Sequence, residues 1–143
     1  MTDSIHRTEN VRLKIVTPDR VVLSEEVEQV VAPGSEGYFE VLPKHTPFLT
    51  SLKIGEIRYS KNGEEEVLST SGGFVEVWMN RVTILAETSE LAQEIDRERA
   101  EVARRRAERR LDERAPDTDV ARAEVALKRA LNRLRVAEQL QER

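Results

Sequence analysis

The uneven placement of glycine and aromatic residues is the feature that most limits what this chain can fold into. All 6 glycines and every Phe, Trp and Tyr lie within residues 1–78, and residues 79–143 contain none of them. The later residues are instead rich in Arg, Glu, Ala and Leu, which favour helices, whereas glycine and aromatic residues suit turns and pleated sheets. The sequence therefore predicts a strand-and-turn part followed by a helical part.

Composition excludes several classes of protein. The chain has no cysteine, which rules out disulfides, thiol catalysis and cysteine-ligated zinc. No apolar run approaches the roughly 20 residues needed to cross a bilayer, so we expect no direct membrane insertion. Residues 1–10 are polar and mixed in charge, which is not typical of a signal peptide.

Charge divides the chain in the same place. Residues 1–95 hold 9 Lys or Arg and 16 Asp or Glu, a net charge of −7, whereas residues 96–143 hold 14 and 11, a net charge of +3. A mildly basic arm on an acidic body favours contact with an acidic protein surface or with the body itself. The arm has no aromatic residues for stacking and many interleaved carboxylates, so we expect no nucleic-acid partner.

Short apolar segments separated by turn signals predict a β-sandwich over residues 1–90, ordered from about residue 10. Residues 11–15 alternate between apolar and charged, and Asn62-Gly63 and Met79-Asn80 are typical of tight turns between strands. Eight to ten short strands with frequent turns imply an antiparallel sandwich or flattened barrel. Residues 74–79 carry apolar side chains on both faces, so Phe74 and Trp78 are candidates for partner binding.

The apolar period changes to that of a helix after residue 95, which predicts an α-helical hairpin over residues 91–143 and an α+β fold overall. We expect helices at about 96–114 and 118–141, lying antiparallel because the connection is short. Pro116 ends the first helix, and Asp117 or Thr118 can cap the second. Alanine occupies many contact positions in both apolar stripes, so we expect the seam to bury little area and the hairpin to detach at modest cost.

Catalytic signals are few. The two histidines, His6 and His45, are isolated, which gives neither a metal site nor a relay with a nucleophile. We expect His45 to satisfy backbone groups in its proline-bounded loop, with partner contact as the alternative. Ser71-Gly72-Gly73 lacks the Lys-Ser/Thr of a phosphate-binding loop and indicates a sharp turn or a close backbone approach. We therefore expect no catalytic residues and no metal.

The start of the first helix permits two interpretations. Asp96 stands where the helix begins, and Arg99 and Arg106 are seven residues apart on one helical face, where guanidinium groups can bind phosphate. In the alternative, Asp96 only caps the helix and the arginines are solvated or paired with nearby glutamates. The spacing alone favours this second interpretation.

Taken in order, several segments resemble the epsilon subunit of the bacterial and chloroplast-type rotary ATP synthase. They are residues 34–37 (GSEG), 42–50 (LPKHTPFLT), 52–55 (LKIG), 71–77 (SGGFVEV), 80–87 (NRVTILAE), 95–100 (IDRERA) and 106–111 (RAERRL). Lys44 and Phe48 stand where the family more often has glycine and leucine, and the N-terminus carries extra residues.

The resemblance implies a non-catalytic rotor subunit that couples rotation of the c-ring to ATP synthesis. It implies a sandwich held against the gamma subunit and the c-ring, at the cytoplasmic face of the bacterial plasma membrane. The hairpin would lie folded on the sandwich or extend into the catalytic alpha/beta hexamer and inhibit ATP hydrolysis. Arginines on the hairpin then become candidate contacts with the hexamer: Arg104, Arg105, Arg109, Arg110, Arg122, Arg129, Arg133 and Arg135.

The resemblance also implies no required cofactor but a possible regulatory ATP. In some bacterial members ATP binds the folded hairpin through a motif matched here by Ile95, Asp96, Arg99 and Ala100, and Glu90 and Arg106 align with further nucleotide contacts. Two other functions stay open from the sequence: a free-standing adaptor with a helical protein-binding arm, and a small hydrolase. The hydrolase lacks any nucleophile–base pair.

Overall fold

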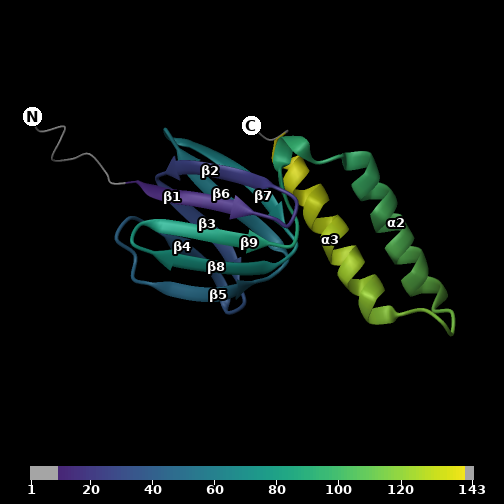
Figure 1. Ribbon diagram of the computed structural model, residues 1–143. Helices are drawn as coiled ribbons and strands as arrows, with labels where there is room; N and C mark the ends of the chain where they lie inside the picture. Colours follow the sequence, from purple (N-terminus) through teal and green to yellow (C-terminus); the bar gives the residue numbers. More distant parts are fainter. Residues whose placement is uncertain (1–9, 141–143) are drawn as a thin grey trace, which may run out of the picture.

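The computed structural model describes residues 10–140, in which ten strands precede a pair of helices (Figure 1). The strands are β1 (Val11–Val16), β2 (Val21–Val27), β3 (Gln29–Gly34), β4 (Gly37–Val41), β5 (Phe48–Leu52), β6 (Gly55–Lys61), β7 (Glu64–Thr70), β8 (Gly73–Trp78), β9 (Arg81–Ala86) and β10 (Ser89–Leu91). A short 3-10 turn, η1 (Ala92–Glu94), leads to α2 (Arg97–Glu113) and α3 (Val120–Glu138). The predicted α+β fold, a β-sandwich followed by a helical hairpin, is confirmed.

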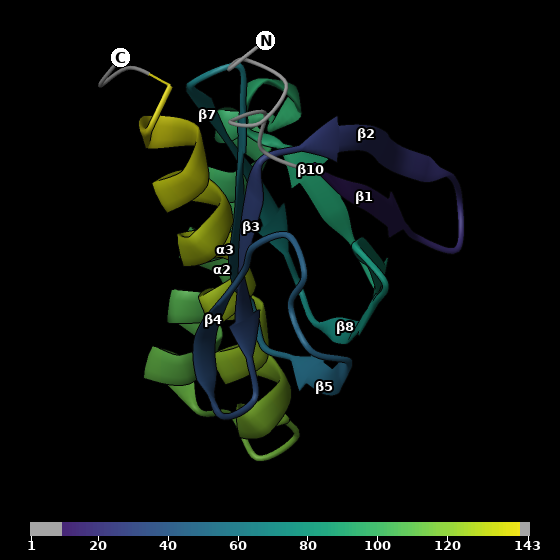
Figure 2. The ribbon, with the colours of Figure 1, turned by 90° about the vertical axis from the view of Figure 1, so that its left-hand side faces the viewer.

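The strands form two layers joined along one path. The hydrogen-bonded order is β10-β7-β6-β3-β5-β8-β9-β1-β2, with β4 paired to β3. A single residue pair, Gly34 with Leu52, joins β3 to β5, and there the path turns from one layer to the other. Figure 2 shows β3, β4 and β7 on one side and β1, β2 and β8 on the other. One pairing departs from the predicted antiparallel pattern, because β1 and β9 are parallel: no hairpin connects these strands, so no turn sets their direction.

Alternation along the strands builds the aliphatic core between the layers. In β1 the side chains of Leu13 and Ile15 are fully buried, and Ile84 of β9 lies directly opposite Ile15. Ile57 and Leu68 contribute from the other layer. The core is therefore built mainly of branched aliphatic side chains, with Tyr59 as its buried aromatic residue.

Backbone conformation confirms the predicted turns. Asn62 (φ 53°) and Gly63 (φ 78°) join β6 to β7. Gly73 has φ 140°, and a Cβ at this position would lie 2.0 Å from the carbonyl oxygen of Leu85. The prediction of a close backbone approach in the glycine pair is thus confirmed. At this position β8 lies so close to the backbone of β9 that only a residue without a side chain is tolerated.

Two details of the strands go beyond the local sequence signals. β2 ends at Val27, and a separate strand, β3, runs from Gln29 through Pro33 to Gly34. The pairing of β3 with β6 ends at Val31, before Pro33. Pro33 has no backbone N–H, but no hydrogen bond to β6 is lost there. The short strand β10, which pairs with β7, was not predicted.

The helices pack on each other through alanine, with α3 between the sandwich and α2 (Figure 1). Asp96 caps α2. The cap of α3 is Asp119, and not Asp117 or Thr118, because the carboxylate of Asp119 accepts a hydrogen bond from the N–H of Arg122. Thr118 is instead held in a turn by a hydrogen bond from its N–H to the carbonyl of Ala115, which delays the helix start. Within residues 10–140 neither helix is apolar over a length that could cross a membrane.

Candidate functional site

The junction between the sandwich and α3 has a small apolar centre. Five side chains form it: Val67, Ala92, Ile95, Val136 and Ala137. Because the set consists of two alanines and three branched residues, its apolar contribution is modest. Polar contacts around it therefore decide how firmly α3 is held.

Asn132 is the most buried of these polar groups, with 4% of its surface exposed. Its Nδ2 donates to the carbonyl oxygen of Gly55 at 2.8 Å and lies 3.5 Å from that of Thr70. Gly55 and Thr70 face each other at the ends of β6 and β7, so the amide fixes α3 at one position along this sheet end. Its Oδ1 is buried without a partner among the described residues, an unfavourable feature that weakens the same contact.

Two ion pairs on one side of Asn132 and the side-chain amide of Gln139 on the other extend the contact between α3 and the sandwich. The guanidinium of Arg133 donates to both carboxylate oxygens of Glu90 on β10, from Nε at 2.7 Å and from Nη2 at 3.2 Å. Arg129 reaches Glu87 at 3.4 Å. Towards the end of α3, Gln139 donates to Glu56 at 2.7 Å and accepts from Arg58 at 2.8 Å. Arg129 and Arg133, predicted to meet a partner, thus bind the sandwich in this conformation.

The predicted phosphate-binding arginines come together on one groove. Arg99 and Arg106 line it with Arg133, Glu98, Val102 and Ala103, and it encloses about 520 Å³. A second groove of about 500 Å³ shares Ala103 and Arg133 and continues towards Arg20, Glu87 and Arg129. Neither Arg99 nor Arg106 forms an ion pair within residues 10–140, and the nearby Glu101 and Glu108 pair with Arg104 and Arg105 instead. Two guanidinium groups are therefore left open to an anion.

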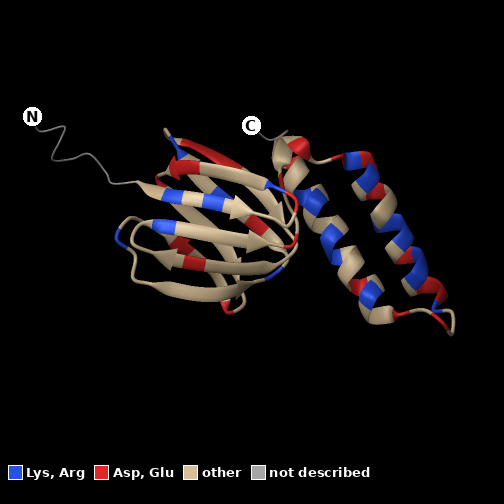
Figure 3. Ribbon diagram, viewed as in Figure 1, with Lys and Arg blue, Asp and Glu red and all other residues tan. Residues whose placement is uncertain are grey.

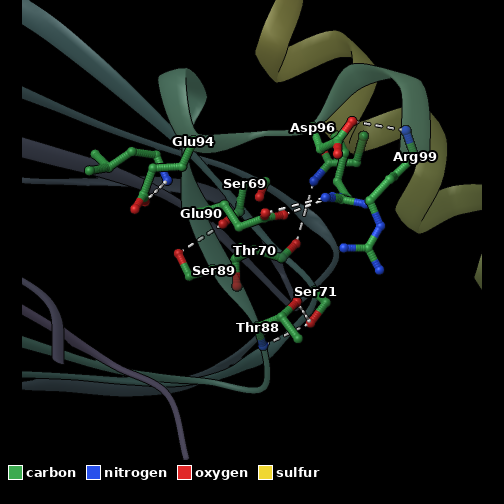
Figure 4. A network of polar contacts seen from close by, with 12 residues as sticks. Ser69, Thr70, Ser71, Thr88, Ser89, Glu90, Glu94, Asp96 and Arg99 are labelled. Carbon is green, nitrogen blue, oxygen red and sulfur yellow. Dashed lines mark hydrogen bonds and ion pairs between the residues drawn. The ribbon is translucent and has the colours of Figure 1, made fainter. Parts of the chain in front are cut away.

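The rest of the predicted nucleotide motif has structural roles here. Asp96 accepts the N–H of Arg99 at 3.1 Å, so the capping interpretation holds for this residue (Figure 4). Ile95 belongs to the apolar centre, and Ala100 is fully buried in the helix seam. Glu90 stands beside Ser89, whose hydroxyl donates to the carbonyl of Ser69 and secures β10 on β7 (Figure 4).

An ion pair also ties the β1–β2 turn to the 3-10 turn. Arg20 hydrogen-bonds both carboxylate oxygens of Glu94, at 3.3 and 3.2 Å. This contact lowers the pKa of the Glu94 carboxyl and raises that of Arg20; burial opposes the first shift, and the N–H of Leu91 supports it. Glu94 is therefore charged over the whole neutral range, and the turn is held by an ion pair there.

The remaining predicted residues lie on the surface. Arg105, Arg109, Arg110 and Arg122 are exposed, and Figure 3 shows basic residues along both helices. His45 is half-buried, with its Nδ1 donating to the carbonyl of Thr46 at 2.7 Å, as the backbone interpretation expected. Phe74 and Trp78 project outward from β8 and are 60% and 54% exposed. Within residues 10–140 no cluster of metal-binding side chains is found.

Sequence reasoning missed Asn132, Gln139 and Arg20. The first two lie on a second face of α3, at the helical spacing 129, 132, 136 and 139, which is mostly polar and so gives no apolar stripe. A search for buried polar positions at helical spacing is the signal that finds them.

Comparison with known proteins divides the chain in the same way. The family "ATP synthase, Delta/Epsilon chain, beta-sandwich domain" matches residues 10–92, and "ATP synthase, Delta/Epsilon chain, long alpha-helix domain" matches residues 93–138. The ATP synthase epsilon chain of Pelotomaculum thermopropionicum is 57% identical over 128 residues, 90% of this chain and 96% of the relative. That of Syntrophobacter fumaroxidans is 52% identical over 131 residues, covering 92% and 98%.

A solved structure agrees at the level of the fold. A chain in the Euglena gracilis mitochondrial ATP synthase, described as OSCP/F1/c-ring in rotational state 1, superposes with a TM-score of 0.75 at 21% identity. The match covers 94% of this chain and 82% of that one. The arrangement of a sandwich followed by a helical hairpin is therefore shared with a protein of very different sequence.

Proposed function

The chain belongs to the family of ATP synthase delta and epsilon chains, and from this premise we propose that it is a non-catalytic rotor subunit whose helical hairpin inhibits ATP hydrolysis. One observation carries the proposal. The hairpin is fastened to the sandwich by a small apolar centre and a few polar contacts, one of which leaves the buried Oδ1 of Asn132 without a partner among residues 10–140. An element held in this way is able to leave without exposing a large apolar surface.

The sandwich is the part proposed to stay on the rotor. Its partners are the gamma subunit and the c-ring, at the cytoplasmic face of the membrane that holds the complex. The exposed aromatic side chains of Phe74 and Trp78 support a protein contact on β8, because aromatic residues are enriched in protein interfaces. Co-purification with gamma tests this, and a free-standing adaptor would not form that complex.

The hairpin is the part proposed to move. Extended, it meets the catalytic alpha/beta hexamer, and the basic residues along both helices (Figure 3), several of them exposed, support contact with an acidic surface. We expect the triple variant Arg109→Gln, Arg110→Gln and Arg122→Gln to relieve inhibition of ATP hydrolysis in the reconstituted complex. Lys53→Gln with Lys61→Gln is the control, since these exposed cations lie on the sandwich. Equal inhibition by the triple variant and wild type would contradict the proposal.

ATP is the proposed regulatory ligand of the folded hairpin. The open guanidinium groups of Arg99 and Arg106 on one groove support binding of its phosphates. ATP would shift the population towards the folded hairpin only by its difference in affinity for the two states. Calorimetric titration of the full chain tests it: we expect heat with wild type and its loss with Arg99→Ala or Arg106→Ala. No heat from wild type at millimolar ATP would remove nucleotide sensing from the function.

A further inference from the structure

Arginines follow the same spacing on both helices of the hairpin. They are Arg99, Arg106 and Arg110 on α2, and Arg122, Arg129 and Arg133 on α3, separated in each helix by 7 and then 4 residues. Residues at these separations lie on one face of a helix. With a rise of about 1.5 Å per residue, each set extends over about 16 Å. These six residues are called the arginine row below.

Two grooves place both sets on the same side of the hairpin. The groove near the sandwich brings Arg99 and Arg106 of α2 together with Arg133 of α3. Another groove lies at the tip of the hairpin, where Arg110 and Arg122 line a hollow of about 430 Å³. Because the two helices run side by side (Figure 1), the arginine row follows one side of the hairpin from the sandwich to the tip.

Most of the arginine row is unpaired. Four of its members form no ion pair within residues 10–140, and the other two, Arg129 and Arg133, bind carboxylates of the sandwich. Three carboxylates line the same two grooves: Glu98, Asp117 and Asp119, of which Asp119 is occupied as the cap of α3. The acidic residues within α3, Glu124 and Glu138, lie on the opposite side of that helix. The free guanidinium groups therefore outnumber the free carboxylates beside them.

We propose that the arginine row binds a linear polyphosphate longer than the triphosphate of ATP, with its phosphates on arginines of both helices. The inference rests on the proposed function and deepens it, because the phosphates of ATP would occupy only the end of the row at Arg99 and Arg106. Guanidinium groups bind phosphate oxygens in pairs. A chain of linked phosphates continues this contact from the sandwich to Arg110 and Arg122 at the tip.

Two other kinds of polyanion fit this surface less well. Single-stranded nucleic acid gains affinity from bases stacked on aromatic side chains, and residues 79–143 contain none. An acidic peptide has backbone groups that need hydrogen-bond partners, whereas helices satisfy their own backbone internally except at the ends. The walls beside the arginines include Val102, Ala103 and Ala123, which offer no such partners. A polyphosphate needs neither bases nor backbone contacts, because its polar groups are all phosphate oxygens.

The test is calorimetric titration of the full chain with linear polyphosphate, tripolyphosphate and ATP at 50 and 150 mM NaCl. The test variant, Arg110→Gln with Arg122→Gln, removes two cations from the tip end of the row. The control, Lys128→Gln with Arg135→Gln, removes two exposed cations from the opposite side of α3.

We expect wild type to bind polyphosphate about tenfold more tightly than tripolyphosphate, and to lose that affinity more steeply with salt, because more phosphates are neutralised. The test variant should weaken polyphosphate binding about tenfold and change tripolyphosphate and ATP binding less than about twofold. The control should change the affinity for each ligand less than about twofold. Circular dichroism of each variant verifies that the helices remain intact.

The other outcomes separate this inference from the proposed ATP site. If polyphosphate binds no more tightly than tripolyphosphate, or binds the test variant as it binds wild type, the arginine row is overturned and the ATP site stands. If polyphosphate binds while ATP gives no heat, the ATP site fails and the row stands. An equal loss in the test and control variants overturns the row, because overall charge would then explain the binding. A polyglutamate peptide that binds as tightly as polyphosphate overturns the assignment to phosphate.

Discussion

Replacing Asn132 by aspartate is the sharpest perturbation of the contact between hairpin and sandwich, because it changes chemistry without changing shape. The amide nitrogen that donates to Gly55 at 2.8 Å becomes a carboxylate oxygen facing a carbonyl oxygen. The introduced carboxyl would be buried, since only 4% of the surface of Asn132 is exposed. Burial of this kind raises the pKa of a carboxyl by about 3 units, which costs about 4 kcal/mol at neutral pH.

The cost falls on the docked state alone, because in a released hairpin the carboxyl is in water. A change of about 4 kcal/mol shifts the docking equilibrium about a thousandfold. Asn132→Ala is the control: it loses a hydrogen bond worth about 1 kcal/mol but also removes the unpaired Oδ1. We therefore expect Asn132→Asp to release the hairpin at pH 7.5 and Asn132→Ala to weaken docking only slightly.

The assay is the distance between spin labels at Glu40→Cys on β4 and Asp117→Cys in the turn between the helices. The chain has no cysteine of its own, so these are the sole labelling sites. The pH dependence gives a second check: the folded pKa is raised, so the destabilisation is full above that pKa and fades as the pH falls towards the unfolded value of about 3.9. At pH 5 about 1.5 kcal/mol should remain. If Asn132→Asp shows the same distance between the labels as wild type at pH 7.5, the reasoning is refuted.

Further changes probe the sandwich and the helix ends. Gly73→Ala should cost more than about 3 kcal/mol in thermal unfolding, because its Cβ meets backbone at 2.0 Å, whereas Gly63→Ala, with open space around it, should cost about 1 kcal/mol; equal losses would contradict the close approach. Glu94 has a lowered pKa, so its pair with Arg20 stabilises the fold above about pH 4.3 and is lost as the pH falls through the lowered value. Glu94→Gln should thus lower stability at pH 7 by at most about 1 kcal/mol and match wild type near pH 2; a constant difference would exclude the ion pair as its cause. Arg114 caps α2 in the left-handed region (φ 42°), so Arg114→Gly should raise the melting temperature slightly, and a fall would argue against strain there.

The sequence predicts the sandwich well because its signals are local. Alternation fixes which side chains of β1 enter the core, and Asn62-Gly63 fixes a turn without help from distant residues. The parallel pairing of β1 with β9 joins segments about 70 residues apart, and no local pattern specifies it. Asp117, Thr118 and Asp119 are all residue types that can cap α3. The turn that holds Thr118 makes Asp119 the cap, and the sequence alone does not show that turn.

The candidate site is predicted only in part, for a different reason. The seven-residue spacing of Arg99 and Arg106 places both on one groove, as expected from helical geometry. Arg133 completes that groove from α3 while it binds Glu90, a contact that depends on how the hairpin rests on the sandwich. Spacing within one helix carries no information on such a contact.

The weakness of the sequence signal on α3 and the proposed mobility of the hairpin have the same physical origin. A helix that stays docked on the sandwich can have a second apolar face besides the one that packs on its partner helix. The sequence would then show a second apolar stripe. α3 instead presents Arg129, Asn132, Arg133 and Gln139 to the sandwich, with Val136 and Ala137 as its apolar contribution. Those polar groups exchange protein partners for water when the helix leaves, so release costs little. An apolar face in their place would make docking predictable from the sequence and would hold the hairpin permanently on the sandwich.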